Sequence, residues 1–193
     1  MRIAVDARKI RDGGIGSYIR GLLGALGTAS GGHEITALLA PGEIGRTRWP
    51  GPVREIPVRA GKYGFTEHVV VPRAARRAGA DLLHAPHYTL PLGWSGPSVV
   101  TIHDLTHIRY GRLFPPGAAA YARAIAGAAA RRARCVIVDS SFGRDEVARW
   151  LGVPADKVRV IPLGVSPAFA PASGEQIAAL RAKRRLPAHY LLY

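Results

Sequence analysis

The stretch Val99-Val100-Thr101-Ile102-His103-Asp104 is an apolar run of strand type that ends in an imidazole beside a carboxylate. In open α/β sheets, polar residues at the carboxyl end of a buried strand face the ligand crevice. A second such place lies near the start of the chain, where Ile3-Ala4-Val5-Asp6 predicts a first strand and Gly13-Gly14-Ile15-Gly16 leads into a helical pattern. Together the two segments favour a phosphate or nucleotide ligand and a site centred on His103.

Strand-like runs bounded by turn residues recur along the whole chain, and segments of helical periodicity lie between many of them. This alternation implies right-handed crossovers and a parallel sheet covered on both faces. The sequence therefore predicts a Rossmann-like, doubly wound parallel α/β sheet. The predicted strands are residues 2–6, 34–40, 53–58, 81–84, 98–103, 134–138 and 158–161, and the predicted helices are residues 16–26, 118–133, 141–151 and 174–185.

A proline-rich segment, Pro162 to Ser173, is the only linker-like passage and predicts a domain boundary. We expect residues 1–170 to form the main domain. Residues 171–193 then hold a short basic helix and the start of a new strand at Tyr190 to Tyr193. The chain is expected to end in the middle of a larger architecture.

Composition indicates a globular chain with a buried core, because 48% of its 193 residues are hydrophobic and only 21% are charged. The single cysteine, Cys135, supports neither a disulfide framework nor a thiolate metal site and is expected to be a small buried hydrophobe. Met1 runs directly into the first strand, and no apolar run approaches the roughly 20 residues of a membrane span. These features predict a cytoplasmic protein.

The formal net charge of +14 is compatible with anionic partners, but much of it reflects a general richness in arginine. The basic segments 72–77 and 131–134 are interpreted as helix ends, where cations complement the helix dipole and face solvent. An acidic lipid surface or a lipid-phosphate acceptor stays open as a partner, which would place the protein at the inner face of a membrane. Nucleic acid is not expected, because aromatic residues are few and are not interleaved with the basic ones.

The glycine segment has a physical logic, since glycines let the backbone approach an anion and the following helix presents free N–H groups. A phosphate would lie against Gly14 to Ser17. The segment is not a P-loop, since no Gly-Lys-Ser/Thr follows, and it lacks the third glycine of the dinucleotide fingerprint. A plain tight turn is the alternative interpretation.

At the other strand end, His103 could act as a base, donate to a sugar hydroxyl or offer its backbone carbonyl. Asp104 could orient His103 or cap the next segment, and a satisfied buried pair is the structural alternative. The loop after the strand at 81–84, with His87 and Tyr88, is expected beside His103. Its histidines follow no zinc-binding pattern, so no metal is predicted. Asp139-Ser140-Ser141 is either a third strand-end site or a helix N-cap.

Several segments in this order resemble the N-terminal domain of retaining GT-B glycosyltransferases of family four, also called glycosyl transferase group one, in its mannosyltransferase-like branch. The resemblance runs from Arg2 to Phe169. It rests on Val5-Asp6-Ala7-Arg8, Gly13-Gly14-Ile15-Gly16-Ser17-Tyr18, His84-Ala85-Pro86-His87-Tyr88, Thr101-Ile102-His103-Asp104-Leu105, Val138-Asp139-Ser140-Ser141-Phe142 and Val158-Arg159-Val160-Ile161-Pro162-Leu163-Gly164-Val165.

The resemblance implies two Rossmann-like domains facing across a cleft, with the acceptor held mainly by the N-terminal domain and a nucleotide sugar by a C-terminal domain that this chain lacks. The family transfers a sugar, here expected to be mannose or glucose, with retention and usually without a metal or other cofactor. The glycines would face the donor diphosphate, and His103 would contact the transferred sugar. The implied catalytic residues are His103 and Asp104, and the implied substrate-binding residues are Gly13, Gly14, Gly16, Tyr18, His87, Tyr88, Ser140 and Ser141.

As an isolated half, the chain is expected to fold, to be inactive and to associate with itself through the exposed cleft surface. Two other function classes stay open. The chain could be a stand-alone or split-subunit module that binds a phosphorylated or sugar ligand. It could also be a basic domain that binds membrane surfaces or other polyanions, for which binding would depend strongly on salt.

Overall fold

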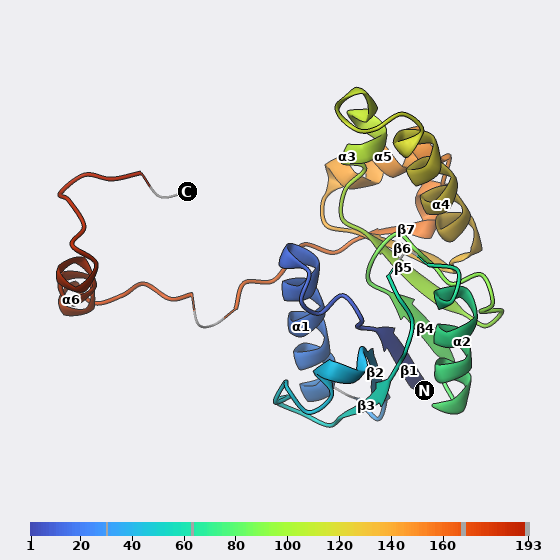
Figure 1. Ribbon diagram of the computed structural model, residues 1–193, viewed down its shortest axis with the longest axis horizontal. Coiled ribbons are helices and arrows are strands. Elements are labelled where there is room, and N and C mark those ends of the chain that lie inside the picture. The colour runs from blue at the N-terminus through green and yellow to red at the C-terminus, as the bar shows by residue number, and fades with distance from the viewer. Residues whose placement is uncertain (30, 63, 167–168, 192–193) are drawn as a thin grey trace. The chain divides into compact units, whose positions relative to one another are not determined.

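A seven-stranded, entirely parallel sheet forms the centre of residues 1–163 in the computed structural model, which describes residues 1–29, 31–62, 64–166 and 169–191 (Figure 1). The strand order is β3-β2-β1-β4-β5-β6-β7. The sheet confirms the predicted Rossmann-like fold class. Its strands are β1 (Arg2–Asp6), β2 (Glu34–Leu39), β3 (Val53–Pro57), β4 (Leu82–Ala85), β5 (Ser98–Ile102), β6 (Cys135–Val138) and β7 (Val158–Val160).

The seven predicted strands between residues 2 and 161 are all present, with their ends displaced by at most one residue, and the four predicted helices are also found. The α-helices are α1 (Gly13–Thr28), α2 (Glu67–Arg77), α3 (Thr106–Arg109), α4 (Ala118–Arg132), α5 (Ser141–Leu151) and α6 (Gly174–Arg184), and the 3-10 turns are η1 (Pro41–Glu43), η2 (Gly111–Leu113) and η3 (Ala155–Lys157).

The path of the chain through the sheet reverses between β1 and β4. From β1 the strands proceed outward to β3, and the chain then crosses to the other side of β1 and proceeds outward to β7. At such a switch point the two crossover connections leave on opposite sides, so the carboxyl ends of β1 and β4 border a crevice. The residues after these strands, together with those after β5 and β6, are therefore placed to meet a ligand.

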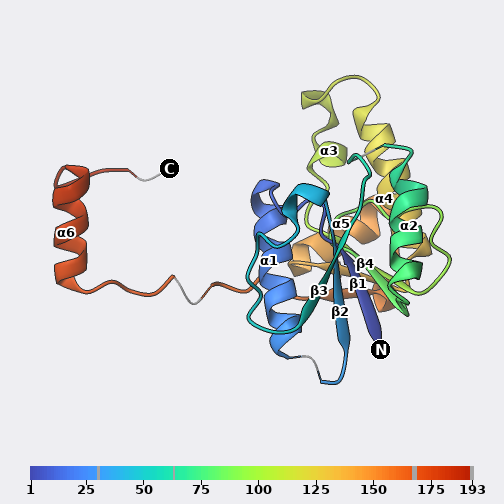
Figure 2. The same cartoon turned by 60° about the horizontal axis from the view of Figure 1, so that its bottom comes forward.

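Helices cover both faces of the sheet because β1 is apolar on both. Val5 packs with Ile19 and Leu23 of α1, whereas its neighbour Ala4 belongs to the cluster that includes Val71 of α2. Successive strand residues point to opposite faces, so α1 and α2 lie on opposite sides, as Figures 1 and 2 show. This double burial fixes β1 and the loop that follows it.

Helix α2 continues through Pro72, a residue that normally ends a helix. Proline has no N–H, so the carbonyl oxygen of His68 loses its helical partner, and the backbone N–H of Gly93 donates to it over 3.0 Å instead. A Cβ at Gly93 would lie 2.4 Å from that oxygen, which accounts for glycine there. Sequence reasoning located only the basic end of this helix, because the compensating donor comes from a distant loop.

The chain divides into two units, Met1–Leu163 and Gly164–Tyr193. The second unit contains α6, which begins with a capping box. Ser173 Oγ accepts a hydrogen bond from the backbone N–H of Gln176, and Gln176 Oε1 accepts one from the backbone N–H of Ser173. Of the predicted strand at 190–193, Tyr190 and Leu191 adopt no regular secondary structure, and the other two residues lie outside the described residues. The domain assignment of residues 171–193 stays a prediction.

Two further features of the chain bear on its environment. Cys135 is a free thiol that is half-buried rather than fully buried as expected. Among the residues that the structure describes, no helix is long and apolar enough to cross a membrane.

Candidate functional site

Polar side chains from four neighbouring strand ends meet at the carboxyl edge of the sheet. Arg8 and Lys9 follow β1, His87 follows β4, His103 follows β5 and Asp139 follows β6. The parallel register brings these ends together, because Val5 pairs with His84 and Ile102 pairs with Val138. The predicted proximity of the His87 loop and His103 agrees with this register.

His103 and Asp139 form a hydrogen-bonded pair. The pairing of Ile102 with Val138 places the next residue of each strand side by side, and His103 Nδ1 lies 2.8 Å from Asp139 Oδ2. Each side chain is about one-fifth exposed. Sequence reasoning quoted Asp139 but gave it no role toward His103. The available signal was the position of both residues directly after adjacent parallel strands.

The pair has a defined chemistry. A carboxylate only accepts, so Nδ1 of His103 carries the proton and neutral His103 keeps its lone pair on Nε2. Nε2 of His103 and Oδ1 of Asp139 are shielded from solvent and have no hydrogen-bond partner among the described residues. Both atoms are therefore suited to accept a hydrogen bond from a ligand hydroxyl that reaches this edge of the sheet.

Tyr18 connects helix α1 to the same site. Its ring packs edge-on against His103 at a centroid distance of 4.7 Å, and its hydroxyl lies 3.1 Å from Thr101 Oγ1, which also contacts His84 Nε2 at 2.8 Å. Burial, with a smaller effect from His103, lowers the pKa of His84 to about 4, so His84 is neutral at pH 7. Burial also raises the pKa of Tyr18. The network thus positions Tyr18 without adding charge.

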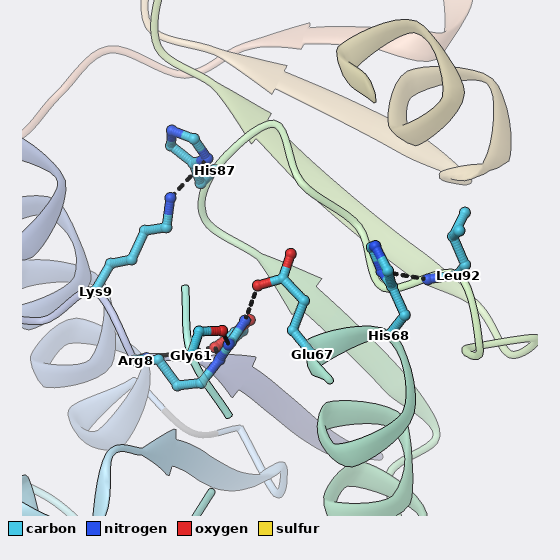
Figure 3. Close-up of polar contacts among 8 residues, drawn as sticks. Arg8, Lys9, Gly61, Glu67, His68, His87 and Leu92 are labelled. Carbon is cyan, nitrogen blue, oxygen red and sulfur yellow. Dashed lines mark hydrogen bonds and ion pairs between the residues drawn. The ribbon is translucent and has the colours of Figure 1, made fainter. Parts of the chain in front are cut away.

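A buried lysine and histidine face each other across the switch-point crevice (Figure 3). Lys9 Nζ lies 3.1 Å from His87 Nδ1. Burial lowers the pKa of Lys9 to about 8, and burial together with the charge of Lys9 lowers the pKa of His87 to about 3. At pH 7 the ammonium therefore donates to a neutral imidazole, and the ring proton of His87 lies on Nε2. Lys9 brings a positive charge to the crevice that sequence reasoning missed.

Arg8 holds the loop after β1 through a buried ionic cluster (Figure 3). Its guanidinium binds both carboxylate oxygens of Asp6 at 2.7 and 2.8 Å, Glu67 Oε2 at 3.1 Å and the carbonyl oxygen of Gly61 at 3.0 Å. The side chains of Arg8 and Glu67 are 3% and 4% exposed. Because this arginine is enclosed by its partners, it anchors β1 to α2 rather than reaching a ligand.

The three predicted loop glycines have different surroundings. A Cβ at Gly16 would lie 2.4 Å from the carbonyl oxygen of Ile10, so this glycine lets the preceding loop pack against α1. Gly13 has a φ of +38°, and a Cβ at Gly13 or Gly14 would meet nothing within 4 Å. Among the described side chains none caps the N-terminus of α1, where both glycines are exposed. An anion can therefore approach Gly13 and Gly14, while Gly16 has a packing role.

The remaining predicted site residues lie nearby. The carboxylate of Asp104 accepts a hydrogen bond from the N–H of Thr106 at 2.8 Å, so Asp104 caps the next segment. It does not orient His103, whose partner is Asp139. Ser140 caps α5 by accepting from the N–H of Gly143 at 3.1 Å. Exposed Ser141 begins α5, and half-buried Tyr88 packs on His87 at a ring distance of 3.9 Å.

A cavity of about 340 Å³ lies beside the pair. Its lining includes His103, the N-terminal turn of α5 and the side chains of Arg109, Tyr110 and Phe142. Tyr110 is 49% exposed and Phe142 is 59% exposed, so both residues extend from the cavity lining to the surface. Within the described part of the chain, no group of three or more His, Cys, Asp or Glu side chains is arranged to hold a metal ion.

Comparison with known proteins identifies a family for this chain. A family model of Glycosyltransferase Family 4 matches residues 12–169. No match is found among curated protein sequences.

Solved structures share the fold at low sequence identity. Sucrose-phosphate synthase from Thermosynechococcus elongatus has a TM-score of 0.70 and 22% identity, over 97% of this chain and 53% of that one. HepE from Anabaena in complex with UDP-glucose has a TM-score of 0.64 and 18% identity, over 96% of this chain and 50% of that one. A glycosyltransferase from Rickettsia africae has a TM-score of 0.57 and 15% identity, over 97% of this chain and 50% of that one. The chain thus spans about half the length of these structures.

Proposed function

Because the chain belongs to Glycosyltransferase Family 4 and has the fold of a GT-B N-terminal domain, we propose that it forms the acceptor-side half of a sugar-transferring enzyme. The donor would be a nucleotide sugar carrying glucose or mannose, and the acceptor a hydroxyl group. The HepE structure with UDP-glucose supports UDP-glucose as the first donor to test. Transfer with retention follows from the family resemblance.

The observation that carries this proposal is the His103–Asp139 pair, against which Tyr18 of α1 packs. Nε2 of His103 and Oδ1 of Asp139 are both acceptors in need of a donor, and sugar hydroxyls supply such donors. In the proposed complex a sugar hydroxyl donates to His103 Nε2. His103 thereby holds the transferred sugar, and Asp139 is a positioning residue that fixes the imidazole tautomer.

The charge of the donor would be met by two features of the crevice. The exposed N-terminal turn of α1 offers the backbone N–H of Gly14 and the positive end of the helix dipole, while the N–H of Gly13 donates to the carbonyl oxygen of Arg11. Lys9 adds a cation at the carboxyl end of β1. A diphosphate that leaves the sugar gains negative charge, so both features favour the transition state over the bound donor. The protein then acts by positioning and charge stabilisation.

The cavity lined by His103, Tyr110 and Phe142 is the proposed acceptor site. Turnover is proposed to need a second, donor-binding domain, so the 193 residues alone would bind without transferring sugar. Self-association through the crevice surface stays a prediction. The free thiol of Cys135 is compatible with a reducing, cytoplasmic location, which is also proposed.

Titration of the chain with UDP-glucose and with GDP-mannose, followed by amide and imidazole nitrogen NMR, tests the proposal. We expect the shifts of Gly13, Gly14 and the His103 ring nitrogens to move with one of the two donors, and glucose alone to have little effect. The His103→Ala variant should bind the nucleotide part almost unchanged. Shifts confined to other parts of the sheet, or none with either donor, would contradict the proposed site.

A further inference from the structure

The segment that joins α3 to α4 exposes large apolar side chains. We name residues 109–123 the α3–α4 tip. Figures 1 and 2 both show its turn projecting beyond α3. Leu113 is 81% exposed, Tyr121 is 56% exposed and Tyr110 is 49% exposed. In a 3-10 turn, residues three apart lie above one another, and Leu113 donates its N–H to Tyr110 O. Tyr110 and Leu113 therefore share one face of the tip.

The α3–α4 tip is cationic throughout. Residues 105–138 include six arginines and neither aspartate nor glutamate, and Arg109, Arg112 and Arg123 lie on the tip and are exposed. Of the nearby carboxylates, Asp104 caps α3 at Thr106, and Glu146 of α5 lies 3.7 Å from Arg109. Positive charge on the tip is therefore not balanced within its own segment.

The tip is continuous with the cavity that contains His103. The Arg109 guanidinium lies 5.3 Å from the ring centre of Tyr110 and 5.0 Å from that of Phe142, and all three side chains line the cavity. Tyr110, which shares a face of the tip with Leu113, thus connects the tip to the cavity lining. A partner that covers the tip would also lie against the opening of the cavity.

We propose that the α3–α4 tip docks on the surface of an anionic lipid bilayer. Tyrosine rings favour the bilayer interface, Leu113 is suited to enter the acyl boundary, and arginines contact lipid phosphates while their stems stay on apolar surface. The aliphatic anchor distinguishes this surface from a nucleic-acid site, which would rely on rings for base stacking. The docking is independent of sugar transfer and would place the cavity mouth at the membrane.

Sedimentation with vesicles of phosphatidylcholine, alone or mixed with phosphatidylglycerol, tests the proposal on the 193-residue chain. We expect binding only to the mixed vesicles and weaker binding at high salt. Each arginine near an anionic surface contributes about fivefold in affinity, so Arg112→Gln with Arg123→Gln should weaken binding about 25-fold. Arg48→Gln with Arg54→Gln removes the same charge from exposed positions elsewhere and should change binding about twofold or less.

The apolar anchor has its own matched pair. Leu113→Ser should weaken vesicle binding several-fold, whereas Leu163→Ser, at a leucine that is 55% exposed, should not. Melting temperatures of all variants show that they are folded. The proposal is overturned if the two arginine double variants lose the same vesicle affinity or if the two leucine variants have equal effects. It is also overturned if the chain does not bind mixed vesicles, or if it binds polyuridylate but not vesicles.

Discussion

Replacing Arg8 by methionine should destabilise the protein strongly. Arg8 makes four hydrogen bonds to Asp6, Glu67 and Gly61, and its side chain is 3% exposed. The variant keeps two buried carboxylates without their cation, which costs roughly 3–5 kcal/mol. A domain of this size loses about 2–4 °C of Tm per kcal/mol, so the Tm should fall by about 6–20 °C.

Urea unfolding followed by circular dichroism measures this loss, and two further variants identify its cause. Arg11→Met breaks the ion pair with Glu43, in which Arg11 is 60% exposed, and should cost at most about 1 kcal/mol. Arg8→Met combined with Asp6→Asn and Glu67→Gln removes all three charges of the cluster and should recover most of the stability. The reasoning fails if Arg8→Met costs no more than Arg11→Met, or if the triple variant is less stable than Arg8→Met alone.

Three smaller effects follow from local geometry. Gly16→Ala should lower the free energy of unfolding by about 1–3 kcal/mol through its clash with Ile10, whereas Gly14→Ala, in open space, should leave it unchanged or raise it by up to about 1 kcal/mol. His84 has a pKa of about 4 in the folded protein, below its unfolded value. Its contribution to stability is therefore complete above about pH 6.5 and is lost as the pH falls toward 4. His84→Gln should reduce the slope of unfolding free energy against pH in this range by up to about 1.4 kcal/mol per pH unit. Ser140→Ala should cost about 1 kcal/mol as a lost N-cap. Urea titrations, repeated across pH for the histidine, measure all three. Equal effects of Gly16→Ala and Gly14→Ala would contradict the clash with Ile10. An unchanged pH slope in His84→Gln would contradict the role of His84, and unchanged stability of Ser140→Ala would contradict the role of Ser140 as an N-cap.

The sheet was predictable because its strands carry local signals. Apolar runs bounded by turn residues identify β1 to β7 within one residue, and Gly152, with a φ of +65°, ends α5 where the sequence predicts. The two missed helices lack such signals. Pro72 interrupts the pattern of α2 and is tolerated only because Gly93 supplies a hydrogen bond from outside the helix. Helix α3 is a single turn of four residues.

The partners within the site were less accessible to sequence reasoning. His103 was identified as a candidate from its position after a buried strand, and Asp104 was left either to orient His103 or to cap the next segment. The structure has Asp104 capping α3, whereas the carboxylate beside His103 belongs to Asp139. The pairing with Asp139 depends on β5 and β6 being adjacent and in register. Similarly, Lys9 reaches His87 only because β1 and β4 are neighbours across the switch point. Contacts between strand ends follow from sheet order, which a single sequence does not specify.

The most direct test of the account is sugar transfer by the protein as its own cells produce it, measured with radiolabelled UDP-glucose or GDP-mannose and an extract of those cells. His103→Ala is expected to lower kcat by about 100-fold or more while leaving the nucleotide affinity nearly unchanged, and His33→Ala, at an exposed histidine near the N-terminus, should have no effect. Transfer by His103→Ala at the rate of the unaltered protein would contradict the role of His103. Absence of transfer from either donor by the unaltered protein would contradict the proposed donors.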